Sequence, residues 1–407
     1  MNLINRKMKG ITIINKILNC RFYNDKLTNS LSENFSEFNS KNYSMEIDSL
    51  RGVAILLVFF VHVLGAMVDK NIHIPHNGSG FFFSFIFSGA TGVTLFFVIS
   101  SFLLSIPFYL KSQTNRIKFY KKRLLRILPL FFITVSIAGL MTPNGRSHPS
   151  EIFKSYFFLF DQWKLFPFCT IWWSLRTEME FYLLLGLLMP LIHFRKGRRI
   201  LLLSIAGILG GRYVILNNAE IIVKHRLFGT ILSESVFAYA PTFLIGIFTS
   251  FIYLKYGSRL KTYFNSKKAF KNGLSDILFL FILFMLSFVL FKVAISGGML
   301  AVRFTWPQHY TYEACFWGLI LLSLIVLPLK LKFFIINKYL SRLGKISYSF
   351  YLIHFPVIFY INGMKRYPVN INLLVKVLFI FVIVFIFSLF SYWYIEKPFL
   401  NIKDKLK

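Results

Sequence analysis

The stretch SLRGVAILLVFFVHVLGAMV, residues 49–68, decides the fold. It has the length and the apolar composition that a helix needs to cross a bilayer, which is about 20 residues. Two ionisable side chains interrupt it, with Arg51 near its start and His62 well inside it. Ionisable groups within such a segment are costly and mark functional sites by default. The stretch therefore predicts a transmembrane helix that carries a functional polar face.

The composition of the whole chain agrees with a membrane protein. Of its 407 residues, 56% are hydrophobic and 50 are Phe, and the mean hydropathy is +0.61. Charged residues make up 15% of the chain, against about 25% in a typical soluble domain. We expect one membrane domain and no sizeable soluble domain.

Nine further apolar segments follow the first one. Together they predict an all-α, polytopic membrane helix bundle with about ten transmembrane helices. The second and sixth segments are long, and Pro107 and Pro241 are their expected break points. The ten segments are 49–68, 81–110, 127–141, 171–193, 200–216, 229–254, 273–296, 312–330, 346–363 and 372–396.

The net charge of +31 would suggest nucleic acid binding in a soluble protein. Here the basic residues lie in short clusters between apolar segments, where they would face anionic lipid, and no nucleic-acid recognition motif is evident. By the positive-inside rule, their distribution predicts that both termini are cytoplasmic, as in a multi-pass protein of the inner or plasma membrane. The basic segments are 1–47, 111–126, 194–199, 255–272, 330–345 and 397–407.

Three regions follow from this organisation. Residues 1–45 are polar and rich in Asn, Ser and Lys, which predicts a poorly ordered cytoplasmic extension. Residues 46–398 form the membrane domain, and residues 399–407 form a basic cytoplasmic tail. The three cysteines lie far apart without metal-ligand spacing, so we expect no metal.

Arg51 and His62 are eleven positions apart, so at 100° per residue they share one helix face, about 16 Å apart along the axis. This spacing suits a coenzyme A thioester. A guanidinium holds phosphate at the membrane surface, and a neutral imidazole deeper in the helix takes a proton from an acceptor hydroxyl. The alternative is an Arg that reaches the interface and a hydrogen-bonded core His.

A second basic pair lies before the third apolar segment. Arg123 and Arg126 are three residues apart and project together from a helix. We interpret them as a second clamp for phosphate, and ordinary positive-inside charge is the alternative. Pro129 follows the pair and is expected to bend or to start the third span.

The fourth segment combines aromatic and acidic residues. Trp173 suits the outer interface or a platform on which a sugar stacks. Glu178 lies about 10 Å deep in the helix. It could orient His62 or bond an acceptor hydroxyl, and the alternatives are an ion pair with Arg176 or a packing-level hydrogen bond.

The ninth segment carries a polar stripe. Ser347, Tyr351 and His354 follow the spacing i, i+4, i+7 on one helix face. Such a stripe should face the interior of the bundle, where it could contact substrate, and interhelical hydrogen bonding is the alternative. In the tenth segment, Glu396 meets the basic cytoplasmic layer and is expected to pair with an Arg.

Taken together, these segments resemble the acyltransferase-3 family of integral-membrane O-acyltransferases. The resemblance runs from residue 46 to residue 398, with the motifs in the order of that family. The motifs are Asp48–His62, Leu95–Ser100 before Phe102–Leu104, Arg123 and Arg126 with Pro129, Trp173–Leu175 with Glu178, Phe181 and Tyr182, Gly344–Pro356, and Ser391–Pro398.

The resemblance implies an acyl-CoA donor, with acetyl-CoA expected, and a hydroxyl acceptor on a carbohydrate or glycolipid precursor of the cell surface. The family's functional signatures fall on Arg51, His62, Arg123 and Arg126. They imply a catalytic role for His62 and acyl-CoA binding by the three arginines.

Two residues depart from the family pattern. Ser101 stands where Gly is common, and Arg176 stands where a small or apolar residue is common, which puts the partner of Glu178 in doubt. The rival function is a transporter or flippase whose Arg and His residues line a polar pathway. A membrane scaffold without activity is a third reading, and it leaves the Arg51–His62 spacing unexplained.

Overall fold

The computed structural model describes residues 44–67, 81, 83–109, 115–141, 149–159, 165–193, 195–217, 234–296, 306, 308–363 and 372–405. Within these ranges the chain forms helices and turns and no strand, as the all-α prediction requires. Nearly all of the predicted N-terminal extension lies outside the described residues.

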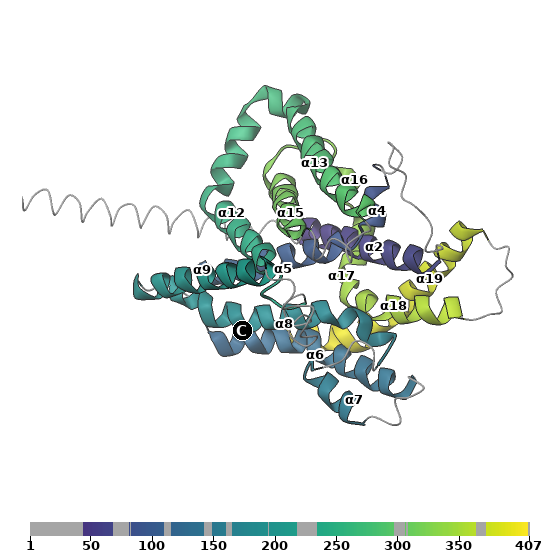
Figure 1. Cartoon of the computed structure of the whole chain (residues 1–407). Coiled ribbons are helices and arrows are strands. Elements are labelled where there is room, and N and C mark those ends of the chain that lie inside the picture. Colours follow the sequence, from purple (N-terminus) through teal and green to yellow (C-terminus); the bar gives the residue numbers. More distant parts are fainter. Residues whose placement is uncertain are drawn as a thin grey trace, which may run out of the picture.

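The helices follow one another along the chain in a bundle (Figure 1). In order they are α2 (Ser44–Met67), α4 (Ser84–Phe87), α5 (Thr91–Tyr109), α6 (Arg116–Met141), α7 (Pro149–Tyr156), η3 (Phe168–Ile171), α8 (Trp172–Leu188), η4 (Met189–His193), α9 (Arg195–Asn217), α12 (Ala240–Ser266), η5 (Phe270–Leu274), α13 (Ser275–Ile295), α15 (His309–Val326), α16 (Lys332–Ile335), α17 (Lys338–Lys345), α18 (Ser347–Gly363), α19 (Leu373–Ser391), η6 (Tyr392–Glu396) and α20 (Lys397–Lys405).

Six helices of the described chain are long and apolar enough to cross a membrane. The predicted segments outside these six are also largely helical, in α8, α9, α12 and α18. The count of ten spans and the cytoplasmic location of the ends stay predictions. The six helices are Met45–Ala66, Thr91–Tyr109, Arg116–Met141, Phe270–Ile295, His309–Val326 and Leu373–Lys405.

The expected break point at Pro107 is wrong, because Pro107 lies inside α5, near its end. The expected break point at Pro241 is confirmed: residues 234–239 form a turn, and Pro241 lies in the first turn of α12, where a helix does not need the missing N–H. The second segment breaks instead at residues 88–90, between α4 and α5. There Gly89 lies so close to the Leu57 carbonyl that a Cβ would clash with it, so the chain turns against α2.

Pro129 lies inside α6, which begins at Arg116. The third span is therefore longer than predicted, and the basic pair Arg123 and Arg126 belongs to the helix itself rather than to the connection before it.

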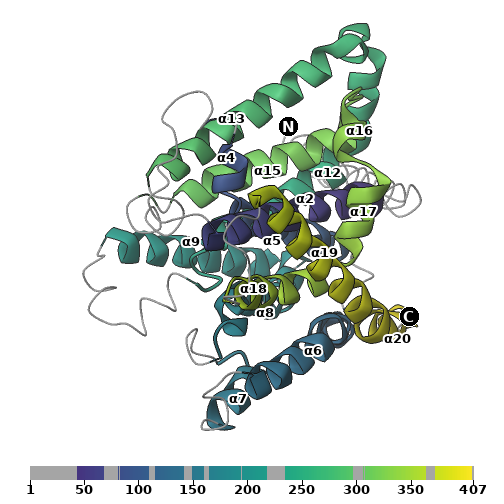
Figure 2. The same cartoon turned by 90° about the vertical axis from the view of Figure 1, so that its right-hand side faces the viewer.

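Helices α2 and α5 lie side by side in the middle of the bundle (Figure 1). Helices α12, α13 and α15 lie on one side of them, and α8 and α6 lie on the other, as the turned view also shows (Figure 2). Helix α18 packs on both α2 and α19. The site described below lies between α2, α5, α6, α8 and α18.

The beginning of α2 and the end of the chain meet at one end of the bundle. Glu396 lies close enough to Arg126 and Arg51 to interact with both electrostatically. Lys403, on α20, lies near Arg126.

Glycines allow the backbone of α2 to touch its neighbours. Gly52 faces the carbonyl of Leu340 on α17, and Gly344 of α17 faces the carbonyl of Asp48 on α2, and neither contact leaves room for a Cβ. On the other side, Gly92 of α5 meets α2 equally closely. Because cores tolerate little overpacking, these contacts fix the rotation of α2, and with it the directions of Arg51 and His62.

Ser101, the first departure from the family pattern, also lies at a close helix contact. Its side chain faces Gly246 of α12, where a Cβ would overlap the Ser101 hydroxyl. The hydroxyl donates to the Phe97 carbonyl on its own helix at 2.8 Å. The close contact of α5 and α12 at Ser101 therefore depends on the missing side chain of Gly246.

Replacing Gly344 with Ala should destabilise the protein by about 1–3 kcal/mol or more, because the new methyl group would press on the backbone of α2. The measurement is the midpoint of thermal unfolding in lipid nanodiscs. Gly207→Ala on α9 is the matched control, since nothing lies within 4 Å of a Cβ there. Equal midpoints for both variants would contradict the proposed constraint on α2.

Candidate active site

A polar pocket opens between five helices at the level of Arg51. It combines two guanidinium groups, one carboxylate and several hydroxyls with an apolar wall. The pocket is lined by Arg51, Val93, Phe96, Phe97, Ser100, Arg126, Ile127, Ser174, Leu175, Glu178, Tyr182, Ser347, Tyr348 and Tyr351.

The positive charge of the pocket comes from α2 and α6. The side chain of Arg51 is only 15% exposed, and its nearest carboxylate oxygen, on Asp48, is 4.0 Å away. Arg51 also interacts electrostatically with Arg126 and Glu178. Two guanidinium groups beside one lining carboxylate leave the pocket positive, which suits a phosphate-bearing ligand.

Of the second predicted pair, Arg123 and Arg126, only Arg126 is part of the pocket lining. The guanidinium of Arg123 lies over the Phe119 ring, 6.0 Å from its centroid. The Nε of Arg123 is buried without a hydrogen-bond partner in the described part of the chain. Arg123 remains close enough to Glu178 and Tyr182 to interact electrostatically with them.

Glu178 is held by two hydroxyl groups. Its Oε1 accepts hydrogen bonds from Ser100 Oγ at 2.7 Å and from the Tyr182 hydroxyl at 2.5 Å. Among the described residues, the hydrogen-bond partner of the His62 side chain is His354 instead. The interpretation that Glu178 orients His62 is therefore wrong, and its role toward an acceptor hydroxyl stays a prediction.

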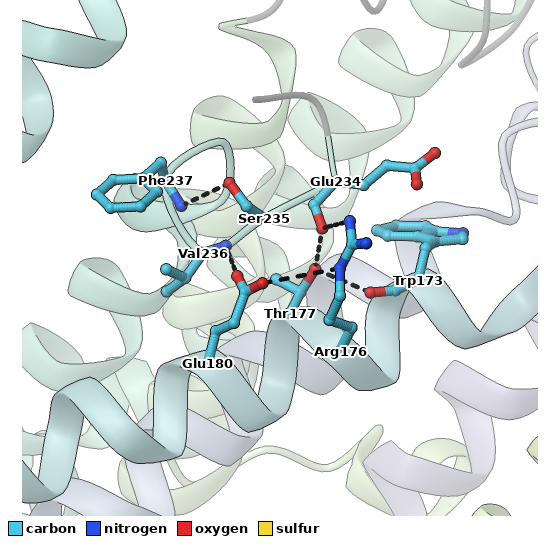
Figure 3. A network of polar contacts seen from close by, with 8 residues as sticks. All are labelled: Trp173, Arg176, Thr177, Glu180, Glu234, Ser235, Val236 and Phe237. Atoms are coloured by element: carbon cyan, nitrogen blue, oxygen red, sulfur yellow. Dashed lines mark hydrogen bonds and ion pairs between the residues drawn. The ribbon is translucent and has the colours of Figure 1, made fainter. Parts of the chain in front are cut away.

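Arg176 pairs with Glu180 and not with Glu178. Its Nε lies 3.7 Å from Glu180 Oε1, and Glu180 Oε2 accepts a hydrogen bond from the backbone N–H of Val236 at 2.8 Å. Thr177 Oγ1 donates to the Glu234 carbonyl at 2.7 Å. These contacts, drawn in Figure 3, hold the turn before α12 against α8. Arg176, the second departure from the family pattern, therefore contributes to packing, and Glu178 lines the pocket.

Trp173 lies on the same stretch of α8 as this network (Figure 3). Its indole stacks on the Tyr239 ring, with centroids 5.5 Å apart and an angle of 26° between the planes. One face of the predicted sugar platform is therefore covered by the protein, and the substrate contact of Trp173 stays a prediction.

The polar stripe of α18 faces the interior, as predicted. Ser347, Tyr351 and His354 are all buried, and the first two line the pocket. The Tyr351 hydroxyl donates to the Ile171 carbonyl at 2.6 Å and lies 2.7 Å from Ser174 Oγ. These bonds hold the Tyr351 ring at the wall of the pocket.

His62 lies next to the far end of this stripe. Its Nδ1 is 3.0 Å from Nε2 of His354, and its ring meets the Phe355 ring edge-on at 5.2 Å. His354 is fully buried, with 0% exposure, whereas His62 is partly exposed. The Tyr351 ring lies 5.6 Å from the His354 ring, so the stripe leads from the pocket to the histidine pair.

Several lining residues carried no role in the sequence analysis. Ser100 and Tyr182 belong to the motifs quoted there, and Tyr182 lies four residues after Glu178, a spacing that predicts contact on a helix.

Glu396 accepts a hydrogen bond from Ser349 Oγ at 2.8 Å. The arginines near it, Arg126 and Arg51, interact with it electrostatically and form no direct ion pair with it. In the described parts of the chain, no group of three or more His, Cys, Asp or Glu side chains could hold a metal ion.

A family model described as an acyltransferase domain, Acyl_transf_3, matches residues 45–393. The chain belongs to this family. Its site therefore lies in an acyltransferase domain, and the positions of Arg51, His62, Arg123, Arg126 and Glu178 fall within the matched range.

Named relatives of the chain include both viral and bacterial proteins. A putative acetyltransferase, ORF330, of Acidianus two-tailed virus is 31% identical over 42% of this chain and 47% of its own length. The O-acetyltransferase OatA of Staphylococcus aureus (strain NCTC 8325 / PS 47) is 25% identical over 80% of this chain and 52% of its own length.

The putative O-acetyltransferase SAS0844 of Staphylococcus aureus (strain MSSA476) is 24% identical over 90% of this chain and 59% of its own length. The chain thus spans about half the length of the relatives that it matches. No solved structure matches it.

Replacing Glu178 with Gln should lower the rate of acyl transfer by about 100-fold, because Arg51 and Arg123 lose the carboxylate that interacts with them electrostatically and orients them at the pocket. Glu180→Gln on the same helix is the matched control, since Gln still accepts from the Val236 N–H. The rates are compared as acyl transfer to the natural acceptor in source membranes. Equal losses in both variants would mean that Glu178 serves packing alone.

Proposed function

We propose that the protein is a membrane O-acyltransferase. It moves an acyl group, most simply acetyl, from acyl-CoA to a hydroxyl of a cell-surface glycan or glycolipid precursor. The observation that carries the proposal is that one face of α2 directs Arg51 into a positive pocket and His62 into a histidine pair. Membership of the acyltransferase family supports it, as does the word O-acetyltransferase in the names of the relatives.

The donor enters from the cytoplasmic side in this proposal. Arg51 and Arg126 bind its phosphates in the pocket, and Arg123 adds charge beside them. The pantetheine arm then follows the face of α2 toward His62, over a distance of about 16 Å along the axis. The buried apolar wall excludes water, which strengthens the contacts of the guanidinium groups.

The chemical step begins with the acceptor hydroxyl. His62 takes its proton while the hydroxyl oxygen attacks the thioester carbonyl. The new C–O ester bond forms, the C–S bond breaks, and the departing thiolate takes the proton back from the imidazolium. A second route gives the same products, with His62 attacking the carbonyl first and carrying the acyl group to the acceptor.

In this proposal the acceptor hydroxyl lies beside the histidine pair, where Tyr351, whose ring reaches from the pocket to His354, orients it. Glu178 and Ser347 bind the parts of the substrates that lie in the pocket, and the indole of Trp173 binds a more distant part of the acceptor. A transporter or flippase with the same residues would move its substrate without consuming acyl-CoA, so donor consumption separates the two functions.

His62→Ala should abolish transfer, with a loss of kcat of at least about 100-fold, because it removes the base that takes the hydroxyl proton in the proposed step. The measurement is release of coenzyme A from acetyl-CoA by source membranes in which this variant replaces the natural protein. Unchanged thermal unfolding in nanodiscs would show that the fold is intact. Turnover at the wild-type rate would remove His62 from the mechanism.

Arg126→Gln should raise the Kd for acetyl-CoA by about 10- to 100-fold, the value of a lost charge-assisted hydrogen bond. The measurement is a titration of the protein in nanodiscs with acetyl-CoA. Lys121→Gln, which removes the same charge from an exposed position of the same helix, is the matched control. A similar Kd for both variants would indicate that the donor does not bind in this pocket.

A further inference from the structure

Two imidazole rings on different helices meet inside the bundle. Nδ1 of His62 on α2 lies 3.0 Å from Nε2 of His354 on α18. Two neutral imidazoles at this distance can bond only if one nitrogen carries a proton and the other does not. The remaining contacts of the two rings decide which nitrogen carries it.

The contacts of His354 fix its own tautomer. Its Nδ1 lies 2.6 Å from the carbonyl oxygen of Tyr351 and 3.2 Å from that of Phe350. A carbonyl oxygen only accepts hydrogen bonds, so Nδ1 of His354 must carry a proton and donate it.

His354 is neutral in this setting. The ring has no exposed surface, lies beside the rings of Phe350 and Tyr351, and forms no ion pair with a carboxylate in the described part of the protein. Burying an unpaired charge in such surroundings is very costly. With its single proton on Nδ1, His354 has a free lone pair on Nε2.

The proton in the contact between the rings must therefore come from His62. Nδ1 of His62 donates to Nε2 of His354, and the neutral His62 ring then has its lone pair on Nε2.

We propose that His354 is a positioning residue that holds His62 in the Nδ1–H tautomer and aims its Nε2 lone pair at the substrate. The proposal rests on the proposed role of His62. It also replaces the predicted substrate contact of His354 with an indirect role, in which a third group orients the base.

The aromatic neighbours add a steric component. The Phe355 ring lies edge-on to His62 at 5.2 Å, and the Phe350 ring is within 20° of parallel to His354. These rings limit rotation of the two imidazoles, and the hydrogen bond then selects one tautomer from the two that the orientation permits.

Two substitutions separate this role from packing. His354→Gln keeps an acceptor, because its amide oxygen can reach the place of Nε2, whereas His354→Leu fills the space without one. We expect His354→Leu to lower kcat by about 100-fold with little change in the KM for acetyl-CoA, and His354→Gln to recover most of the loss. Kinetics are measured with acetyl-CoA and source membranes that contain the natural acceptor.

A direct test determines the protonation of the two ring nitrogens of His62. Nitrogen-15 NMR of histidine-labelled protein in nanodiscs, with His62→Gln as the difference control, reports which ring nitrogen of His62 carries a proton. We expect Nδ1 to carry it in the wild type and in His354→Gln, and both tautomers to be populated in His354→Leu.

A wild-type signal with the proton on Nε2 of His62 would overturn the proposal, as would a single Nδ1–H tautomer in His354→Leu. The NMR result does not depend on turnover. If His62→Ala remained active while the tautomer was as expected, the proposed catalytic role of His62 would fail and the assignment of His354 as the residue that sets the tautomer would stand.

Discussion

The site depends on how closely α2 packs against its neighbours. Gly52 and Gly344 bring the backbones of α2 and α17 into contact, and Gly92 does the same between α2 and α5. Helices in lipid gain little from burying apolar surface, so close packing at small residues is what holds them together. With both sides of α2 in contact, the helix has one rotation, and its polar face points inward.

This rotation places two sets of functional residues at two positions along α2. At the first position, Arg51 joins Arg126 and Glu178 around a pocket of positive charge. At the second position, about three turns deeper, His62 meets His354. The stripe of α18 runs beside both, since Ser347 and Tyr351 line the pocket and His354 completes the pair. A donor with a phosphate head and a reactive end on a long arm matches this layout.

The sequence predicted features that depend on one helix alone. The shared face of Arg51 and His62 and the inward stripe of α18 follow from helical periodicity, which is local. Contacts between helices could not be predicted from the periodicity of a single helix. The bond between His62 and His354 depends on how far α18 is shifted along α2. The bond from the Val236 N–H to Glu180 depends on where the turn before α12 lies, whereas the pair of Arg176 and Glu180 is a local contact within α8. The break at residues 88–90 likewise reflects the contact of Gly89 with α2 rather than local proline chemistry.

The most direct measurement is a cryo-EM structure of the protein in nanodiscs with a non-hydrolysable acetyl-CoA analogue. The account predicts phosphate density at Arg51 and Arg126, and the thioester mimic within about 3–3.5 Å of Nε2 of His62, the distance of a reactive contact. An analogue bound with its phosphates away from both arginines, or with its thioester mimic outside the reach of His62, would contradict it.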